Sequence, residues 1–186
     1  MSVQLARHRF SVEEYHRMAQ AGIFSEDDRV ELIEGEVVAM SPIGSRHAAC
    51  VKRLLRLFDR SVGDRAIVSV QDPIRLSERS EPQPDLMLLK PRSDFYGQAH
   101  PGPADVLLLI EVAETSADSD RGVKLALYAR AGISEVWLVD LERERVELYW
   151  NPAPGGYQES RTVGRGERLA PQALPDLDIA GEAVLG

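Results

Sequence analysis

A chain of 186 residues has the length of about one ordinary domain and can bury roughly two-thirds of the surface that its unfolded form exposes. With 44% hydrophobic and 28% charged residues the composition is globular, and no run approaches the roughly 18 apolar residues that a membrane span needs. The single cysteine, Cys50, excludes a disulfide framework and a cysteine-based zinc site. The first residues lack the apolar core of a secretion signal, so we expect one soluble, cytoplasmic domain over 1–186.

The net charge of −8 opposes binding of nucleic acid through a broadly basic surface. It leaves room for a metal-dependent phosphodiesterase, because clustered carboxylates hold a hard cation and a local basic patch can hold the strand. The charge therefore argues against a strong DNA-binding module more than against an enzyme.

Hydrophobic periodicity and turn residues predict a mixed α/β protein with its core over 29–150. In chain order we expect a helix over 11–22, a hairpin over 29–40, a helix over 45–62, strands over 66–70, 73–76, 85–89 and 106–112, a helix over 118–131, and strands over 135–140 and 145–149. The runs 85–89 and 106–112 are almost continuously apolar, which is typical of strands covered on both faces. We therefore expect a central mixed sheet flanked by helices, followed by a tail over 151–186 that wraps its edge.

Local signals support the first two helices. Ser11 and Glu14 have the spacing of a capping box, and Gly22 is a helix stop. The second helix has apolar residues at helical spacing, which we expect to pack on the sheet: Val51, Leu54, Leu55, Phe58 and Val62.

Glu111 is the informative anomaly, because it lies inside the apolar run Leu-Leu-Leu-Ile-Glu-Val, where an unpaired charge costs several kcal/mol. Asp85 opens the other buried strand directly after Pro84, and neighbouring strands would place the two carboxylates side by side. Two like charges at such a short distance need a shared proton or a cation between them. A pair of hard oxygen donors with open positions describes a Mg²⁺ site, which Mn²⁺ can also fill.

Lys124 lies on the expected helix that follows the Glu111 strand, and a helix packed back on the sheet brings its ammonium to the metal pair. Such a lysine would hold or deprotonate the attacking water and offset charge that grows on the phosphate. Asp85, Glu111 and Lys124 are therefore a sufficient set for hydrolysis of a phosphodiester.

Several segments resemble the Uma family, bacterial proteins of restriction-endonuclease type within the PD-(D/E)XK nuclease superfamily. The segments are RVELIEGEVVAMSP over 29–42, His47 at a helix start, the Pro84-Asp85 pair, IEVAETS over 110–116, and the stretch from Asp120 through GISEVWLVD. The resemblance spans about Phe10 to Tyr149.

This resemblance implies a nuclease core that hydrolyses DNA, with Asp85 and Glu111 as metal ligands. In that family the lysine of the third motif position is displaced onto the following helix, and here Ala113 stands at the usual position while Lys124 lies downstream. Glu31 matches the early acidic site residue better than Glu34, which we place in a turn. A homodimer is expected, because nucleases that cut both strands often pair two sites about a twofold axis.

Other interpretations stay open. Glu111 can instead pair with an arginine such as Arg75, and Lys124 can be a surface partner of Asp120. The chain can also be an inactive nuclease-fold binding or assembly module, which Ala113 and the acidic charge favour, or a metal-dependent phosphodiesterase that acts on RNA or nucleotides. Four further residues stay outside the expected mechanism as local hydrogen-bonding or packing residues: His47, Cys50, Trp137 and Tyr149.

Overall fold

The computed structural model describes residues 7–25, 27–114 and 117–186, without the side chains of 117–121. A six-stranded sheet runs through its centre in the order β3-β4-β5-β6-β7-β8, with β5 and β6 parallel and every other neighbouring pair antiparallel. Its strands are β3 (Ile67–Val70), β4 (Leu86–Leu89), β5 (Val106–Ala113), β6 (Glu135–Asp140), β7 (Arg145–Ala153) and β8 (Gly156–Val163). The mixed sheet that the sequence predicts is confirmed.

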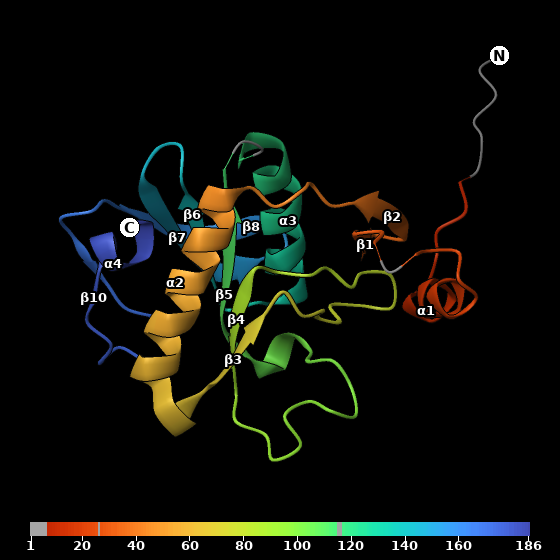
Figure 1. Ribbon diagram of the computed structural model, residues 1–186, viewed down its shortest axis with the longest axis horizontal. Coiled ribbons are helices and arrows are strands. Elements are labelled where there is room, and N and C mark those ends of the chain that lie inside the picture. The colour runs from red at the N-terminus through yellow and green to blue at the C-terminus, as the bar shows by residue number, and fades with distance from the viewer. Residues whose placement is uncertain (1–6, 26, 115–116) are drawn as a thin grey trace.

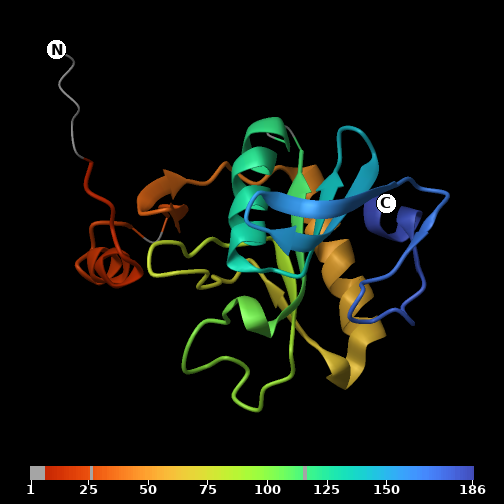
Figure 2. The same ribbon diagram turned by 180° about the vertical axis from the view of Figure 1, so that it is seen from behind.

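Helices cover both faces of this sheet, as the apolar runs at β4 and β5 require. The helix α2 (Ser45–Val62) lies on one side of β5 and α3 (Ala117–Ala131) on the other, which Figure 1 shows and Figure 2 shows from behind. Phe58 of α2 packs with Trp137 in one core, whereas Leu127 and Tyr128 of α3 belong to the second. The connection from β5 through α3 to β6 is the crossover that joins two parallel strands.

An N-terminal helix, α1 (Val12–Gln20), and a hairpin of β1 (Val30–Ile33) and β2 (Glu36–Ala39) stand at one end of the molecule, opposite the C-terminus (Figure 1). The capping box of Ser11 and Glu14 is present. Glu34 and Gly35 have positive φ in the turn, as expected of a tight hairpin. The hairpin forms a sheet of its own and is joined to the loop before β4 by pairing between Leu32 and Glu81.

Two sequence expectations are wrong. The segment Pro73–Leu76 forms no strand, because its backbone bonds run to two different loops: Ile74 N–H donates to Pro82 O and Arg75 N–H to Pro101 O. Leu55 does not pack on the sheet but is 38% exposed, because it lies at the margin of the apolar stripe of α2.

The C-terminal segment is more regular than an edge-wrapping tail. The strand β7 continues to Ala153 and β8 forms the sheet edge beside it. A short pair, β9 (Arg168–Leu169) and β10 (Ile179–Ala180), leads to α4 (Gly181–Leu185), whose Val184 is buried in the same core as α2. Within the described residues, no helix is both long and apolar enough to cross a membrane.

Candidate active site

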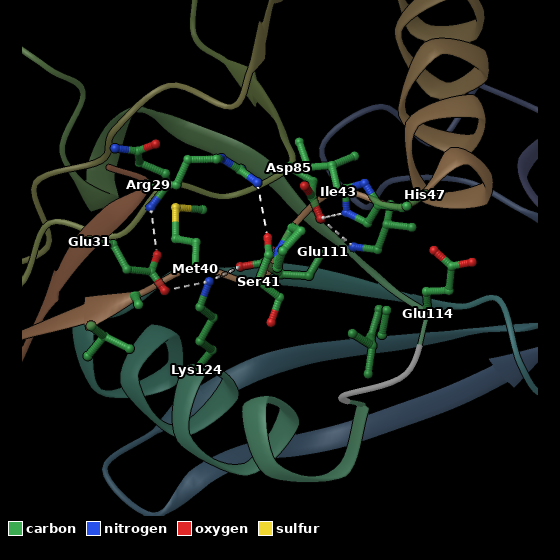
Figure 3. Close-up of a pocket in the computed structure, with 18 of the residues that line it drawn as sticks. Arg29, Glu31, Met40, Ser41, Ile43, His47, Asp85, Glu111, Glu114 and Lys124 are labelled. Atoms are coloured by element: carbon green, nitrogen blue, oxygen red, sulfur yellow. Dashed lines mark hydrogen bonds and ion pairs between the residues drawn. The ribbon is translucent and has the colours of Figure 1, made fainter. Parts of the chain in front are cut away.

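The two predicted metal carboxylates lie at neighbouring points of the β4-β5 pair. Leu86, the first residue of β4, lies opposite Ile110, and Asp85 comes directly before Leu86 while Glu111 comes directly after Ile110. Both side chains line the same cavity (Figure 3).

Asp85 is fixed from three directions. Its Oδ2 accepts a hydrogen bond from Val112 N–H at 2.9 Å and lies 3.0 Å from Nε2 of His47, and its Oδ1 accepts from the Gln71 amide at 3.3 Å. His47 reaches it from the first turn of α2. The hydrogen bond to Asp85 raises the pKa of His47 against the opposing effect of burial. This carboxylate is therefore held by β5, α2 and the segment after β3 together.

Glu111 is a partly buried acid with two donors on one oxygen. Its Oε1 accepts a hydrogen bond from the Tyr128 hydroxyl at 2.5 Å and lies 3.5 Å from Nζ of Lys124. Burial raises the pKa of Glu111 to about 7, the Lys124 ammonium opposes this rise, and the Asp85 carboxylate adds to it. At neutral pH the ionised and protonated forms of Glu111 are thus close in free energy, and a cation would favour the ionised one.

Lys124 joins Glu111 to the hairpin. Its Nζ lies 3.0 Å from Oε1 of Glu31, whose other oxygen accepts from Gln83 N–H at 3.1 Å. Burial alone would lower the pKa of Lys124, but the carboxylates of Glu111 and Glu31 outweigh it and hold the pKa above its ordinary value. Lys124 is therefore an ammonium at neutral pH, suited to stabilise negative charge rather than to take a proton from water.

The structure brings all four sequence-predicted site residues to one cavity of about 210 Å³: Glu31, Asp85, Glu111 and Lys124. The hairpin turn takes Glu34 elsewhere, where it pairs with Arg130 at 2.6 Å.

The sequence left open two alternative ion pairs, one for Glu111 and one for Lys124, and the structure tests only the first. Arg75 pairs with Glu13 of α1, so it is not the partner of Glu111. The proposed pairing of Lys124 with Asp120 lies outside the described side chains.

Two residues that the sequence interpretation left out also reach the site, His47 and Tyr128. Tyr128 lies one helical turn after Lys124 on the same stripe of α3, a spacing that could have identified it. His47 is part of the family resemblance, but its sequence surroundings indicate only a local hydrogen-bonding role, because it is the packing of α2 on the sheet that brings it to Asp85.

The donor set of the site fits a magnesium ion. Within the described residues, no group of three or more His, Cys, Asp or Glu side chains is arranged to hold a metal. Mg²⁺ does not need such a cage, because it is commonly bound by one or two carboxylates and completes its shell with water and substrate phosphates. The shorter hydrogen bonds to Asp85 are accepted by its Oδ2, and both described donors to Glu111 contact its Oε1. Oδ1 of Asp85 and Oε2 of Glu111 therefore keep capacity for a cation.

The sequence matches the profile of the Uma2 family, described as "Putative restriction endonuclease", over residues 12–182. The match covers most of the chain, and the chain belongs to this family. No curated protein matches the sequence.

Among solved structures, the fold is similar to that of a "putative nuclease belonging to DUF820" from Anabaena variabilis, with a TM-score of 0.74 at 15% identity. The similarity covers 95% of this chain and 97% of that one. Family and fold together define a protein of the restriction-endonuclease type.

Proposed function

We propose that this protein is a Mg²⁺-dependent endonuclease that hydrolyses phosphodiester bonds of DNA. The observation that carries the proposal is that Asp85 and Glu111 line one cavity, with the Lys124 ammonium held beside Glu111. With Glu111 ionised, four carboxylates line the cavity against the two cations of Arg29 and Lys124, so the cavity attracts a cation: Glu31, Asp85, Glu111 and Glu114. Mn²⁺ has the same ligand preference and is expected to substitute.

The residues divide the chemistry between them. Asp85 and Glu111 would hold the ion, which when bound supplies charge stabilisation for the phosphoryl group. Lys124 orients the attacking water and offsets the charge that grows on the phosphate oxygens. Glu31 positions Lys124 at 3.0 Å, and Tyr128 positions Glu111 at 2.5 Å. The water oxygen forms the new bond to phosphorus and releases its proton to solvent, and the bond from phosphorus to the leaving sugar oxygen breaks, with that oxygen taking a proton from solvent.

A second candidate is a nuclease-fold binding module that no longer cuts. Ala113, the last residue of β5, carries no amine at the position where the lysine of this motif usually stands, and the net charge is −8. Lys124 argues against this candidate, because its ammonium reaches the carboxylates from α3 instead. The homodimer remains part of our proposal, because nucleases often pair two active sites about a twofold axis.

Cleavage of supercoiled plasmid with Mg²⁺, Mn²⁺ or EDTA tests the proposal, with Glu111→Gln as the site variant. Glu135→Gln is a matched control, because Glu135 is also a buried glutamate on a central strand but bonds Trp137 and Gln172 away from the cavity. We expect metal-dependent nicking by the wild type and the control, and at least a hundredfold loss in Glu111→Gln.

Mg²⁺ titration followed by thermal unfolding separates the two candidates. An enzyme with this site is stabilised by Mg²⁺ through mass action, and Glu111→Gln loses the effect. Absence of both cleavage and Mg²⁺ stabilisation in the wild type would overturn the nuclease and leave the binding module. RNA and nucleotides in the same assay test the alternative substrates.

A further inference from the structure

One face of the β1-β2 hairpin forms a wall of the catalytic cavity. Glu31 lies opposite Val38, and Met40 N–H donates to Arg29 O at 2.8 Å, so Arg29 lies beside Met40. Residues two apart on a strand share a face. Arg29, Glu31, Val38 and Met40 accordingly all line the cavity, with Glu31 as the member that reaches Lys124.

Apolar side chains of this wall, and of the segment that follows it, are open to solvent. Val38 is 39% exposed and Ile43, in the segment that leads to α2, is 42% exposed. Met40 lies near them, and Figure 3 shows Met40 and Ile43 around the same pocket as Asp85 and Glu111. An apolar surface beside a charged reaction centre suits a ligand with a charged group and a flat apolar ring.

Arg29 supplies a second cation to the cavity. Its Nη1 donates to Ser41 O at 3.1 Å, so the guanidinium is held in place by a neutral carbonyl (Figure 3). Lys124, by contrast, is already paired with Glu31 and Glu111. A guanidinium can bind a phosphate through two donors and can also stack on an aromatic ring, and the proposed hydrolysis has no use for Arg29.

The depth of the reaction centre limits what can reach it. The side chains of Glu111 and Asp85 are only 15% and 13% exposed, so a phosphate must enter the cavity to approach them. A cavity of about 210 Å³ is smaller than the roughly 300–1,000 Å³ of pockets that enclose drug-sized ligands. It can take one nucleoside next to the reacting phosphate more readily than a base pair.

We propose that the outer half of the cavity is a nucleoside subsite, and that the protein acts on an unpaired nucleotide. Val38, Met40 and Ile43 contact the base, and Arg29 binds the phosphate attached to it. The substrate is then single-stranded DNA or a locally opened strand rather than an intact duplex. This inference rests on the proposed function, because it assigns the substrate of the same site.

Equilibrium binding of a short fluorescent oligonucleotide, measured by anisotropy with Ca²⁺ and separately with EDTA, tests the subsite without cleavage. We expect the single strand to bind at least tenfold more tightly than the same sequence as a duplex. Replacing one nucleoside at a time by an abasic residue should weaken binding about tenfold or more at one position, which is the usual scale of base stacking on a protein.

Variants of residues that line the cavity test whether the base at the sensitive position of the oligonucleotide contacts this wall. Ile43→Ala should weaken binding of the intact strand and abolish the abasic effect, whereas Leu55→Ala, with 38% exposure on the solvent side of α2, should change neither. Arg29→Gln should weaken binding, and the slope of log affinity against log salt concentration should fall by the amount expected for about one phosphate contact. Arg29→Lys should restore part of the affinity. Arg60→Gln is the charge control, because Arg60 is exposed in the last turn of α2. Unchanged melting temperatures keep the variants interpretable.

Equal binding of duplex and single strand, or an abasic effect that survives in Ile43→Ala, would overturn the subsite. Plasmid cleavage that needs Glu111 would still stand in that case. The expected binding pattern without any metal-dependent cleavage would leave the subsite in place and reject the nuclease.

Discussion

The hydroxyl of Tyr128 donates a 2.5 Å hydrogen bond to Glu111, from a helix that the chain reaches only after leaving the carboxylate's own strand. A hydrogen bond to a charged group contributes about 1.5–3 kcal/mol, which corresponds to roughly one to two pH units. We predict that Tyr128→Phe raises the pKa of Glu111 and moves the pH midpoint of Mg²⁺ binding upward by about one unit. Tyr157→Phe is the control, because the buried Tyr157 hydroxyl bonds Ile133 O instead. An unchanged midpoint in Tyr128→Phe would contradict the role assigned to this bond.

The raised pKa of Glu111 also predicts how stability depends on pH. Burial lifts this pKa from 4.5 to about 7, so the folded state binds the proton more strongly than the unfolded state between these values. The free energy of unfolding should therefore fall as pH rises from about 4.5 to 7, by on the order of 3 kcal/mol at most. Denaturant titrations at pH 5 and pH 8 measure this loss. Glu111→Gln should lack most of it, and a variant that behaves like the wild type would show that another group is responsible.

Proton and metal compete for the same carboxylate. Below about pH 7, where Glu111 takes up its proton, apparent Mg²⁺ affinity should decrease by up to tenfold per pH unit. Calorimetric Mg²⁺ titrations from pH 6 to pH 8 test this, together with the proton release that binding should cause. Affinity that is constant across this range would exclude Glu111 as a ligand.

Substitution of Lys124 should lower turnover without weakening Mg²⁺ binding. Lys124→Met removes the ammonium that stabilises the phosphate, so we predict at least a hundredfold lower turnover. It also removes a cation that lies 3.5 Å from Glu111, so Mg²⁺ should bind at least as tightly as to the wild type. Single-turnover cleavage at saturating Mg²⁺ and a metal titration give the two quantities. Weaker metal binding with unchanged turnover would reverse the assignment.

Substitution of His47 should instead weaken the affinity for Mg²⁺. Its ring nitrogen holds Asp85 at 3.0 Å, and loss of such an outer partner typically costs 10–100-fold in metal affinity. We predict this loss for His47→Ala, with turnover near that of the wild type once Mg²⁺ saturates. His47→Gln keeps an amide donor and should recover part of the affinity. A Mg²⁺ dependence identical to that of the wild type would show that Val112 N–H and Gln71 suffice to hold Asp85.

Local patterns predicted the elements that depend on short-range physics. The capping box at Ser11, the hairpin turn at Gly35 and the helix that ends before Gly63 are all present, because each depends on residues within a few positions. Glu111 was found as a charge in an apolar run, and Asp85 as the start of the neighbouring run. Bringing them to one cavity needed only that the two apolar runs form adjacent strands, as β4 and β5 do.

Long-range packing determined what the sequence could not show. The periodicity of α2 did not distinguish Leu55 from its buried neighbours, because Leu55 lies at the margin of the apolar stripe. The apolar residues of Pro73–Leu76 are buried without pairing as a strand, so hydrophobicity alone suggested the wrong element. His47 enters the site across 38 residues of sequence, a separation that no local rule covers.

The β1-β2 hairpin belongs to a different sheet from the strands that carry Asp85 and Glu111. Substitutions at its cavity face, at Arg29, Val38 or Met40, therefore leave the backbone ladder of the central sheet intact. Over evolutionary time these three positions can diverge while Glu31, which holds Lys124, and the reaction chemistry are inherited unchanged. If the proposed nucleoside subsite lies here, descendants of one ancestral enzyme can come to act on different nucleic acids through changes at these positions alone.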